Sequence, residues 1–352
     1  MQKILSFLSL FLVLLLWISA YSTYLSPASF SAYLSVVGLC FPFFVVGVLG
    51  MLLVCLLFKP RILWIPLVGI IGSFGTLRDY CPVNVPSPAP KGCLKILSYN
   101  VMCFGAWVRD ENNELMVPQY ICAQKPDVAC LQECSFRDTL DQHAVVNIMR
   151  RNGYNFEWEK IEGNTLACAS RFPIVKTEVL CCDNSHGAVV FYVALSSVDT
   201  LLVVNAHLES MNLTIQEREK FKDLVQKPEG ADTIKGKREI LKKIVDSAPA
   251  RALQADTIAD FLRSHAEKNL ILCGDFNDTP VSYAHRKVCA QLTDAFRASG
   301  NGIGRSFNKD AIYVRIDNIF CSSHWKPYAC KIDNSVSYSD HYSISTYLKR
   351  LK

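Results

Sequence analysis

Charged side chains are almost absent from the first 80 residues of this 352-residue chain. Asp, Glu, Lys and Arg do not occur in residues 4–58, and they are absent again from residues 62–77. A soluble segment of this length would carry charged side chains on its surface. The absence therefore excludes an ordinary soluble amino-terminal region, and it accounts for a mean hydropathy of +0.18, which is high for a wholly soluble protein.

Three apolar stretches in this region are candidates for membrane-spanning helices. Two of them, residues 4–24 and 34–58, exceed the roughly 20 residues that a bilayer core requires. The third, residues 62–77, covers only about 24 Å at 1.5 Å per residue, so it needs flanking residues or a thinner membrane to cross. Residues 1–77 are therefore predicted to form a multi-pass transmembrane region whose partner is the lipid bilayer.

The few cations near these stretches indicate the orientation. Lys3 precedes the first stretch, and Lys59 and Arg61 lie between the second and the third. Under the positive-inside rule all three face the cytoplasm. With three crossings, everything after Arg78 lies on the non-cytoplasmic side. If the third stretch does not cross, the rest of the chain is cytoplasmic instead.

The first stretch has an alternative interpretation as a cleavable signal peptide. Lys3, the apolar run and the small residues around Ser19 and Ala20 fit such a peptide loosely. Its removal would leave the predicted side of the carboxyl-terminal part unchanged, because the second stretch would still end at Lys59 in the cytoplasm.

Residues 78–93 are predicted to be an extended, semi-rigid linker, because they hold four prolines spaced by small and polar residues. The charge balance changes after this segment, since residues 93–352 carry 32 cations and 31 anions. A near-neutral domain lacks the broad positive field of nonspecific nucleic-acid binders. This lowers the expectation of a polynucleotide substrate without excluding one.

The cysteines show no metal-binding pattern. Thirteen of the 15 fall between Cys81 and Cys330, without a C-x-x-C pair or zinc-like spacing. An odd number in an exported domain leaves at least one free thiol, and so many cysteines argue against an oxidising compartment. Those in apolar runs, such as Cys130 and Cys273, are expected to be small core residues.

From residue 94 onward, apolar runs typical of strands alternate with helical patterns. The sequence contains no internal repeats. A long polar helical region at residues 214–266 contains Pro228 and Pro249, so at least two helices are expected there. Helices are also predicted at residues 117–124 and 138–151, and strands at 94–101, 127–132, 154–159, 165–170, 188–195, 201–206, 270–273, 314–320 and 343–348.

Polar side chains follow the ends of several of these strands. Residues 270–273 form a continuous apolar run, typical of a strand buried on both faces, and Gly274, Asp275 and Asn277 come directly after it. The complete set is Asn100, Glu133, His207, Asp275, Asn277, Asp317, Asp340 and His341.

Each member of this set has a plain structural explanation when taken alone. Asn100 fits a turn cap, Glu133 a helix cap, His207 a satisfied core histidine, and Asp317 a partner for Arg315. Together they supply oxygen ligands for a divalent metal, carboxylates to handle a water, and two imidazoles for an oxyanion.

The chain resembles the endonuclease/exonuclease/phosphatase superfamily of metal-dependent phosphoesterases. This superfamily includes the pancreatic deoxyribonuclease, apurinic-site endonucleases, neutral sphingomyelinases and inositol-polyphosphate 5-phosphatases. The resemblance covers about residues 94–350, and bacterial members with amino-terminal membrane helices have a similar layout. The matching segments follow in order: Ser-Tyr-Asn100, Leu-Gln-Glu133, Ala-Ser-Arg171-Phe-Pro-Ile, Asn205-Ala-His207-Leu, Gly-Asp275-Phe-Asn277, Arg-Ile-Asp317 and Ser-Asp340-His341.

The resemblance implies a four-layer α/β sandwich, in which two central mixed β-sheets are flanked by helices, for residues 94–352. It implies that Glu133 binds Mg²⁺ or Mn²⁺, with Asn100 and Asp340 close to the ion.

The resemblance also implies roles for the other five residues. Asp275 would orient or deprotonate the attacking water, and Asn277 would donate to a phosphate oxygen. Asp317 would hold the His341 imidazole in the tautomer whose other nitrogen faces the phosphate, and His207 would be the second imidazole on the opposite side.

The predicted function is a membrane-anchored, divalent-metal-dependent phosphoesterase that uses a water to hydrolyse phosphodiester or phosphomonoester bonds. Nucleic acid, phospholipid and small phosphoesters all remain open as substrates, so endonuclease, exonuclease, phosphatase and phosphodiesterase activities are all possible. The alternative is a catalytically silent binding or scaffold protein on the same fold. Such a protein would typically lose one of the eight site residues, and none is lost here.

Overall fold

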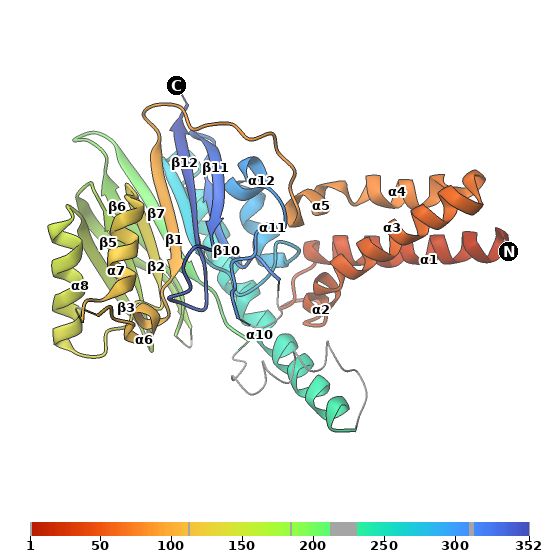
Figure 1. The fold of residues 1–352 in the computed structure, drawn as a ribbon, viewed down its shortest axis with the longest axis horizontal. Coiled ribbons are helices and arrows are strands. Elements are labelled where there is room, and N and C mark those ends of the chain that lie inside the picture. Colours follow the sequence, from red (N-terminus) through yellow and green to blue (C-terminus); the bar gives the residue numbers. More distant parts are fainter. Residues whose placement is uncertain (1, 112, 184, 212–230, 310–312, 352) are drawn as a thin grey trace.

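The computed structural model describes residues 2–111, 113–183, 185–211, 231–309 and 313–351. Two sheets face each other in the carboxyl-terminal part of the chain, and a group of apolar helices extends from one side of it (Figure 1). Strand order in the first sheet is β11-β12-β1-β2-β4-β3, and in the second it is β5-β6-β7-β8-β10-β9.

Each sheet contains one parallel pair, β1/β2 in the first and β7/β8 in the second, and all other neighbours pair antiparallel. Both sheets are therefore mixed. The strands are β1 (Leu94–Asn100), β2 (Val128–Gln132), β3 (Asn155–Ile161), β4 (Asn164–Ser170), β5 (Ile174–Asp183), β6 (His186–Ala194), β7 (Thr200–His207), β8 (Leu270–Asp275), β9 (Thr293–Asp294), β10 (Asp317–Cys321), β11 (Trp325–Asp333) and β12 (Ser343–Arg350).

Three buried clusters hold the layers together. The first lies between the sheets, where Ile96 and Cys130 of one sheet pack with Phe191 and Ile271 of the other. The second lies between the outer face of the first sheet and helices α7 and α8, and the third lies between the second sheet and helices α10 and α11. Helix, sheet, sheet and helix make four layers, as the fold class predicted. Among the described residues, the helices of this part are α6 (Met102–Trp107), α7 (Met116–Gln124), α8 (Thr139–Arg151), α10 (Ala231–Ser264), α11 (Tyr283–Cys289) and α12 (Ala295–Ser299).

Strand β8 is buried along its whole length, which confirms the prediction from its continuous apolar run. Its end lies very close to β7. A Cβ added at Gly274 would be only 2.0 Å from the carbonyl oxygen of Ala206, a contact that real Cβ atoms do not make. Only glycine lets the two parallel strands approach this closely just before Asp275.

Most predicted strands and helices of this part are confirmed within a few residues, and three strands need correction. At least two helices were predicted within residues 214–266, and the described part of that region is one helix, α10, which continues through Pro249. Residues 248, 251 and 252 of this helix are buried against the domain, so packing offsets the hydrogen bond that proline lacks. The rest of the predicted helical region, residues 214–230, lies outside the described residues.

The three corrections concern β5, β11 and β10. Strand β5 was not predicted because it is an edge strand with six of its ten residues exposed, and β11 was not predicted because Pro327 interrupts it. Strand β10 begins at Asp317 rather than at residue 314.

The amino-terminal part contains α1 (Gln2–Tyr21), α2 (Leu34–Leu39), α3 (Phe41–Phe58), α4 (Trp64–Gly72) and α5 (Phe74–Tyr80), with short 3₁₀ turns at Ser22–Tyr24 and Pro60–Ile62. Two helical segments, Gln2–Tyr24 and Phe41–Phe58, are long and apolar enough to cross a membrane. A third qualifies if Pro60–Gly72 and Phe74–Tyr80, which meet at a 58° bend, count as one span.

The span predicted at residues 34–58 consists of two helices, and only the second is long enough to cross a membrane. Pro42 stands in the first turn of α3 and has no N–H to donate to the carbonyl group of Gly38, so α2 and α3 are separate helices. Gly38 of α2 lies against the carboxyl-terminal domain, since a Cβ there would be 2.6 Å from the carbonyl oxygen of Val281. Val281 in turn belongs to the buried cluster of the amino-terminal helices.

Contacts among these helices establish their directions. Helix α1 runs antiparallel to α3, since Ser9 lies beside Cys55 while Leu12 lies beside Gly47. It runs parallel to α4, because Trp17 donates to the carbonyl group of Gly69 and Tyr21 to that of Gly72. The amino end of α1 and the turn from α3 to α4 therefore lie together, at the end of the group farthest from the sheets (Figure 1).

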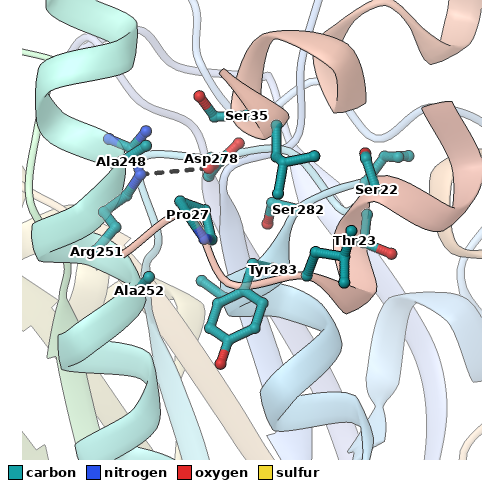
Figure 2. A pocket seen from close by; sticks show the side chains of 14 residues that line it. Ser22, Thr23, Pro27, Ser35, Ala248, Arg251, Ala252, Asp278, Ser282 and Tyr283 are labelled. Atoms are coloured by element: carbon teal, nitrogen blue, oxygen red, sulfur yellow. Dashed lines mark ion pairs between the residues drawn. The ribbon is translucent and has the colours of Figure 1, made fainter. Parts of the chain in front are cut away.

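A small cavity lies where the segment after α1 meets α10 and the loop after β8 (Figure 2). Arg251 and Asp278 form an ion pair on its wall, and Ser22, Pro27 and Tyr283 are among the other lining residues. The space open to the centre of a water molecule is about 10 Å³, enough for about one water. The cavity is too small for a phosphate ester, so it is not a substrate site.

Candidate active site

The polar residues predicted from the sequence gather at one edge of the two sheets. The parallel pair β1/β2 ends at Asn100 and Gln132, and the parallel pair β7/β8 ends at His207 and Asp275. Asp317 begins β10 and lies directly opposite Asp275 in the antiparallel pairing. Carboxyl ends of parallel strands and amino ends of their antiparallel neighbours share one edge of a sheet, so these residues meet there.

Asn100 lies at the centre of the group and is fully buried. Its side-chain amide donates to Glu133 Oε1 at 3.1 Å and to Asp275 Oδ2 at 3.0 Å. The Glu133 side chain is 34% exposed, whereas that of Asp275 is 1% exposed. Asn100 therefore links the partly exposed carboxylate of Glu133 to the buried carboxylate of Asp275.

The backbone around Glu133 is held in an uncommon conformation. Glu133 has a φ of +53°, and the three residues Met102, Cys103 and Phe104 after β1 have φ values of 43° to 56°. The N–H of Met102 donates to Asn100 Oδ1 at 3.1 Å, and that of Cys103 to the carbonyl group of Glu133 at 2.9 Å. Left-handed backbone at non-glycine residues is costly and concentrates at functional sites. These bonds fix the positions of Asn100 and Glu133 relative to each other.

His341 and Asp317 form a buried pair. His341 Nδ1 lies 2.8 Å from Asp317 Oδ2, and its other nitrogen, Nε2, lies 3.6 Å from Asp275 Oδ2. Burial lowers the pKa of His341, but the charges of Asp317 and Asp275 and the bond to Asp317 outweigh burial and raise the pKa to about 10. The imidazole is therefore positively charged at neutral pH.

His207 lies on the other side of Asp275. Its Nε2 is 3.7 Å from both Asp275 Oδ2 and Glu133 Oε1. Its Nδ1 lies 2.8 Å from the side-chain nitrogen of Asn164, whose amide oxygen accepts from the N–H of Thr165. That arrangement favours the tautomer with the proton on Nε2, which faces the carboxylates. Burial raises the pKa of Asp275, while the charges of His341 and His207 oppose that rise.

Asn277 follows β8 with a φ of +50°, a conformation that asparagine tolerates well. Its N–H donates to Asp275 Oδ1 at 2.8 Å and thereby fixes that carboxylate. One N–H of its side-chain amide donates to the carbonyl oxygen of Leu208, at 2.9 Å. Asn277 therefore links the end of β8 to the residue that follows His207.

Asp340 and His341 reach the site from the loop before β12. Ser339 holds this loop in place, because its hydroxyl donates to the carbonyl oxygen of Asn100 at 2.7 Å and accepts from the N–H of His341 at 3.2 Å. The charge of Asp340 is one of the causes that raise the pKa of His341. All eight predicted residues thus belong to one neighbourhood, with Asp340 joined to it through Ser339.

A family model described as Endonuclease/Exonuclease/phosphatase family matches residues 97–341, more than half of the chain. The chain belongs to the endonuclease/exonuclease/phosphatase family. A second model, described as a domain of unknown function (DUF8431), matches residues 2–80, which are the amino-terminal helices. No curated protein matches the chain.

Several solved structures of this fold are similar to the chain. An endonuclease/exonuclease/phosphatase from Beutenbergia cavernae is 16% identical, with 73% of this chain and 72% of that chain covered and a TM-score of 0.49. The human Nocturnin catalytic domain is also 16% identical, with coverages of 76% and 96% and a TM-score of 0.49. The 3′ phosphatase NExo from Neisseria, bound to a product DNA hairpin, is 16% identical, with coverages of 74% and 100% and a TM-score of 0.49. At this identity no substrate can be transferred to the present chain.

Members of the family generally use divalent metals, so we asked whether this site fits one. Glu133 and Asn100 offer hard oxygen donors side by side, and Glu133 is partly exposed, as entry of an ion requires. The amide nitrogen of Asn100 donates to Glu133 and Asp275, while its Oδ1 accepts from the N–H of Met102 and keeps a second lone pair that can bind an ion. The donor set therefore fits Mg²⁺ or Mn²⁺.

Within the part of the chain that the structure describes, two other groups of side chains have ligand-like spacing. Asp275, Asp317 and His341 offer atoms within 4.8 Å of one another, but the 2.8 Å bond between Asp317 and His341 already uses Nδ1 of the imidazole. His285, Cys289 and Asp294 form the second group. Asp294 Oδ2 there already lies 3.0 Å from both His285 Nε2 and Arg315 Nη2, which is a satisfied buried ion pair.

The sequence did not single out several residues that support the site. Gln132 donates to Asn205 Oδ1 at 2.7 Å, and Asn205 donates to the carbonyl groups of Leu131 and Ala167, so these two amides join the sheets beneath the site. Both stand in the quoted Leu-Gln-Glu and Asn-Ala-His segments, which could have indicated them.

Two further residues lie beside His207. The His186 ring is edge-on to the His207 ring with centroids 4.7 Å apart, and His186 Nδ1 lies 3.3 Å from Glu209 Oε2. Nothing in the local sequence distinguishes His186, because it stands at a hairpin turn.

Proposed function

We propose that this protein is a divalent-metal-dependent phosphoesterase held on a membrane by its amino-terminal helices. The observation that carries the proposal is the position of Asp275. This buried carboxylate is bonded to Asn100 and lies within 3.7 Å of two imidazoles, His207 and His341. A water activated beside Asp275 would have that carboxylate as its base. The two imidazoles would supply positive charge, and the metal ligands Glu133 and Asn100 would lie next to them.

Glu133 and Asn100, together with Asp340, would hold the metal, in keeping with the few carboxylates that Mg²⁺ needs. When bound, the metal would offset the negative charge of the phosphate and draw electrons from its oxygens. Every other role in the proposed reaction is assigned to a side chain of the protein.

Asp275 would orient the attacking water and accept its proton. Burial favours the neutral form of this carboxyl group, so the carboxylate is a stronger base than one in water. The N–H of Asn277 and the amide of Asn100 hold both of its oxygens, which keeps the carboxylate aimed in one direction.

The imidazoles would stabilise the charge that grows on the phosphate oxygens in the transition state. Asp317 keeps His341 charged and directs its Nε2 toward the centre of the site. His207, with its Nε2 proton, would donate from the other side, and the second N–H of the Asn277 amide would assist.

A catalytically silent binding protein is the competing function. Such a protein has no need for the bonds that orient Asp275 and His341, and all eight residues proposed for the site are present in the sequence. Within the enzyme proposal, no observation favours nuclease activity over hydrolysis of lipids or small phosphoesters. A panel of plasmid DNA, RNA, sphingomyelin, phosphoinositides and a chromogenic phosphodiester, each with Mg²⁺, tests both points.

The helix directions support a catalytic domain on the non-cytoplasmic side. Lys3, Lys59 and Arg61 all belong to the end of the helix group farthest from the sheets, and the positive-inside rule places that end in the cytoplasm (Figure 1). We therefore expect the exposed thiol of Cys182, in β5, to react with a membrane-impermeant maleimide in intact cells. The measurement is the labelling that is lost when Cys182 is changed to Ser.

The matched control places a thiol at the end of the amino-terminal helices farthest from the sheets. Arg61→Cys, in the Cys182→Ser background, should be labelled only after the membrane is permeabilised. Labelling of Arg61→Cys but not of Cys182 in intact cells would place the domain in the cytoplasm. All 15 cysteines are unpaired, and Cys130 and Cys273 are core residues as predicted, so the fold itself needs no oxidising compartment.

A further inference from the structure

Arg315 is a charged side chain with no exposed surface, and it connects three separate segments of the chain. Its Nη1 donates to Asn318 Oδ1 at 2.7 Å. Its Nη2 donates to Asp294 Oδ2 at 3.0 Å and to the backbone carbonyl oxygen of Asp79 at 2.9 Å. Asp79 is in the last turn of α5, so the amino-terminal helices supply one of the three acceptors.

The bonds of Arg315 continue to the catalytic pair. Asn318, held by Arg315, donates to the carbonyl group of Ile316 at 2.8 Å. On the other side, the Ser306 hydroxyl accepts from the N–H groups of Ile316 and Asp317 at 3.0 and 3.1 Å. Asp317 therefore sits in a backbone segment that is fixed on both sides, and its carboxylate orients His341.

Several contacts hold the end of α5 against the same region. Arg297 Nε lies 2.8 Å from Asp79 Oδ1. Farther along, the side chain of Asn84 donates to the carbonyl groups of Arg297 and Gly300 at 3.1 and 2.6 Å. The segment predicted to be a linker, residues 78–93, is therefore bound to the domain at its start. Its first three residues, 78–80, belong to the end of α5 and are helical rather than extended.

We propose that Arg315 is a positioning residue for the Asp317–His341 pair, and that the amino-terminal helices complete its set of acceptors through Asp79. The inference rests on the proposed roles of Asp317 and His341. Guanidinium is a planar fork of fixed donors, and it can satisfy acceptors in three directions at once. Catalysis therefore depends on the helices being docked, and the helices do more than hold the domain at a membrane.

A purely structural role for Arg315 is the competing explanation, because it also pairs with the buried carboxylate of Asp294. The two roles differ in what a conservative change does. Lysine keeps the charge that Asp294 needs but cannot reproduce the fork that reaches Asn318 and Asp79. Positioning predicts a loss of rate in Arg315→Lys, whereas a structural role predicts a loss of thermal stability alone.

The experiment uses the full-length protein in detergent with the chromogenic phosphodiester and Mg²⁺. We expect Arg315→Lys to lower kcat by about 10- to 100-fold with little change in KM, because small displacements of a catalytic group cost this much. In an Asp317→Asn background the same change should cause no further loss, since Arg315 acts through Asp317. Losses that multiply in the double variant would overturn the proposal.

A second, milder variant keeps the proposal testable in case Arg315→Lys does not fold. Asp79→Ala removes the ion pair with Arg297, whose side chain is 43% exposed, and loosens the last turn of α5. It should lower kcat several-fold. The matched control is Asp199→Ala, which breaks an ion pair with the similarly exposed Arg350 and should leave kcat unchanged.

The results separate this inference from the proposed function. An active wild-type protein whose kcat stays within twofold in both Arg315→Lys and Asp79→Ala would overturn the inference alone. A wild-type protein that hydrolyses no member of the substrate panel would overturn both. A loss of kcat in Asp79→Ala but not in Asp199→Ala supports the dependence on docked helices.

Discussion

Glu133→Gln is expected to lower kcat/KM for phosphoester hydrolysis by about 1000-fold. Glu133 supplies the charged oxygen ligand of the proposed metal site, and glutamine keeps its size but removes the charge. Loss of about 4 kcal/mol of charge stabilisation in the transition state corresponds to this factor. Steady-state rates at several Mg²⁺ concentrations provide the measurement, and the variant should also need more Mg²⁺ for half of its activity.

Folding of this variant should be unaffected, because the Glu133 side chain is 34% exposed and glutamine can still accept from Asn100. Thermal unfolding checks this point. Glu178→Gln is the matched control, since Glu178 is a similarly exposed carboxylate on β5 that pairs with Lys176. A Glu133→Gln variant with near-normal turnover at low Mg²⁺ would show that this carboxylate is not a metal ligand.

His341→Asn should lower kcat by about 100- to 1000-fold, the range measured when one donor to a developing oxyanion is removed. The imidazole carries a positive charge because its pKa is raised to about 10 by Asp317 and Asp275, and asparagine carries none. Rates of hydrolysis with the metal saturating are the measurement. His265→Asn, which changes a half-buried histidine at the end of α10, is the control.

Asparagine is preferable to alanine at this position for a physical reason. Asp317 is fully buried, and its Oδ1 has no hydrogen-bond partner among the described residues, so Oδ2 depends on His341. Removal of the only partner of a buried charge costs about 3–5 kcal/mol of stability. An amide can still donate to Asp317, so rate and stability can be separated. Normal kcat in a folded His341→Asn variant would exclude the proposed role.

The sequence was sufficient to predict that the residues of the candidate site gather at one edge of the sheets, because they stand directly after apolar runs. Strand ends are visible in a sequence as the change from apolar to polar residues, as at Cys273 to Asp275. The pairing of β7 with β8 and of β8 with β10 then places His207, Asp275 and Asp317 in register. The fold class followed from the ordered set of motifs, and both sheets confirm it.

Contacts between distant residues could not be predicted in this way. Arg315 was considered as a partner of Asp317, which is two residues away, but it pairs with Asp294 and with the backbone of Asp79. Likewise, nothing in the sequence connects Asn164 to His207, because the bond depends on how the β3–β4 hairpin meets the second sheet. Such contacts are set by the packing of the layers, which local patterns do not contain.

Local preference alone does not set where the helices begin and end. Pro249 lacks an N–H and would end an isolated helix, yet α10 continues because its buried face packs on the second sheet. The hydropathy pattern predicted one span over α2 and α3, because both helices are apolar. Their separation depends on Pro42 and on the fit of Gly38 against Val281.

Metal-dependent hydrolysis is the central claim, and removal of the metal tests it most directly. The purified full-length protein should hydrolyse at least one member of the substrate panel in Mg²⁺, lose that activity in excess EDTA, and regain it when Mg²⁺ or Mn²⁺ is restored. Hydrolysis that continues unchanged in EDTA, or a folded protein that hydrolyses no member of the panel with either metal, would contradict the claim.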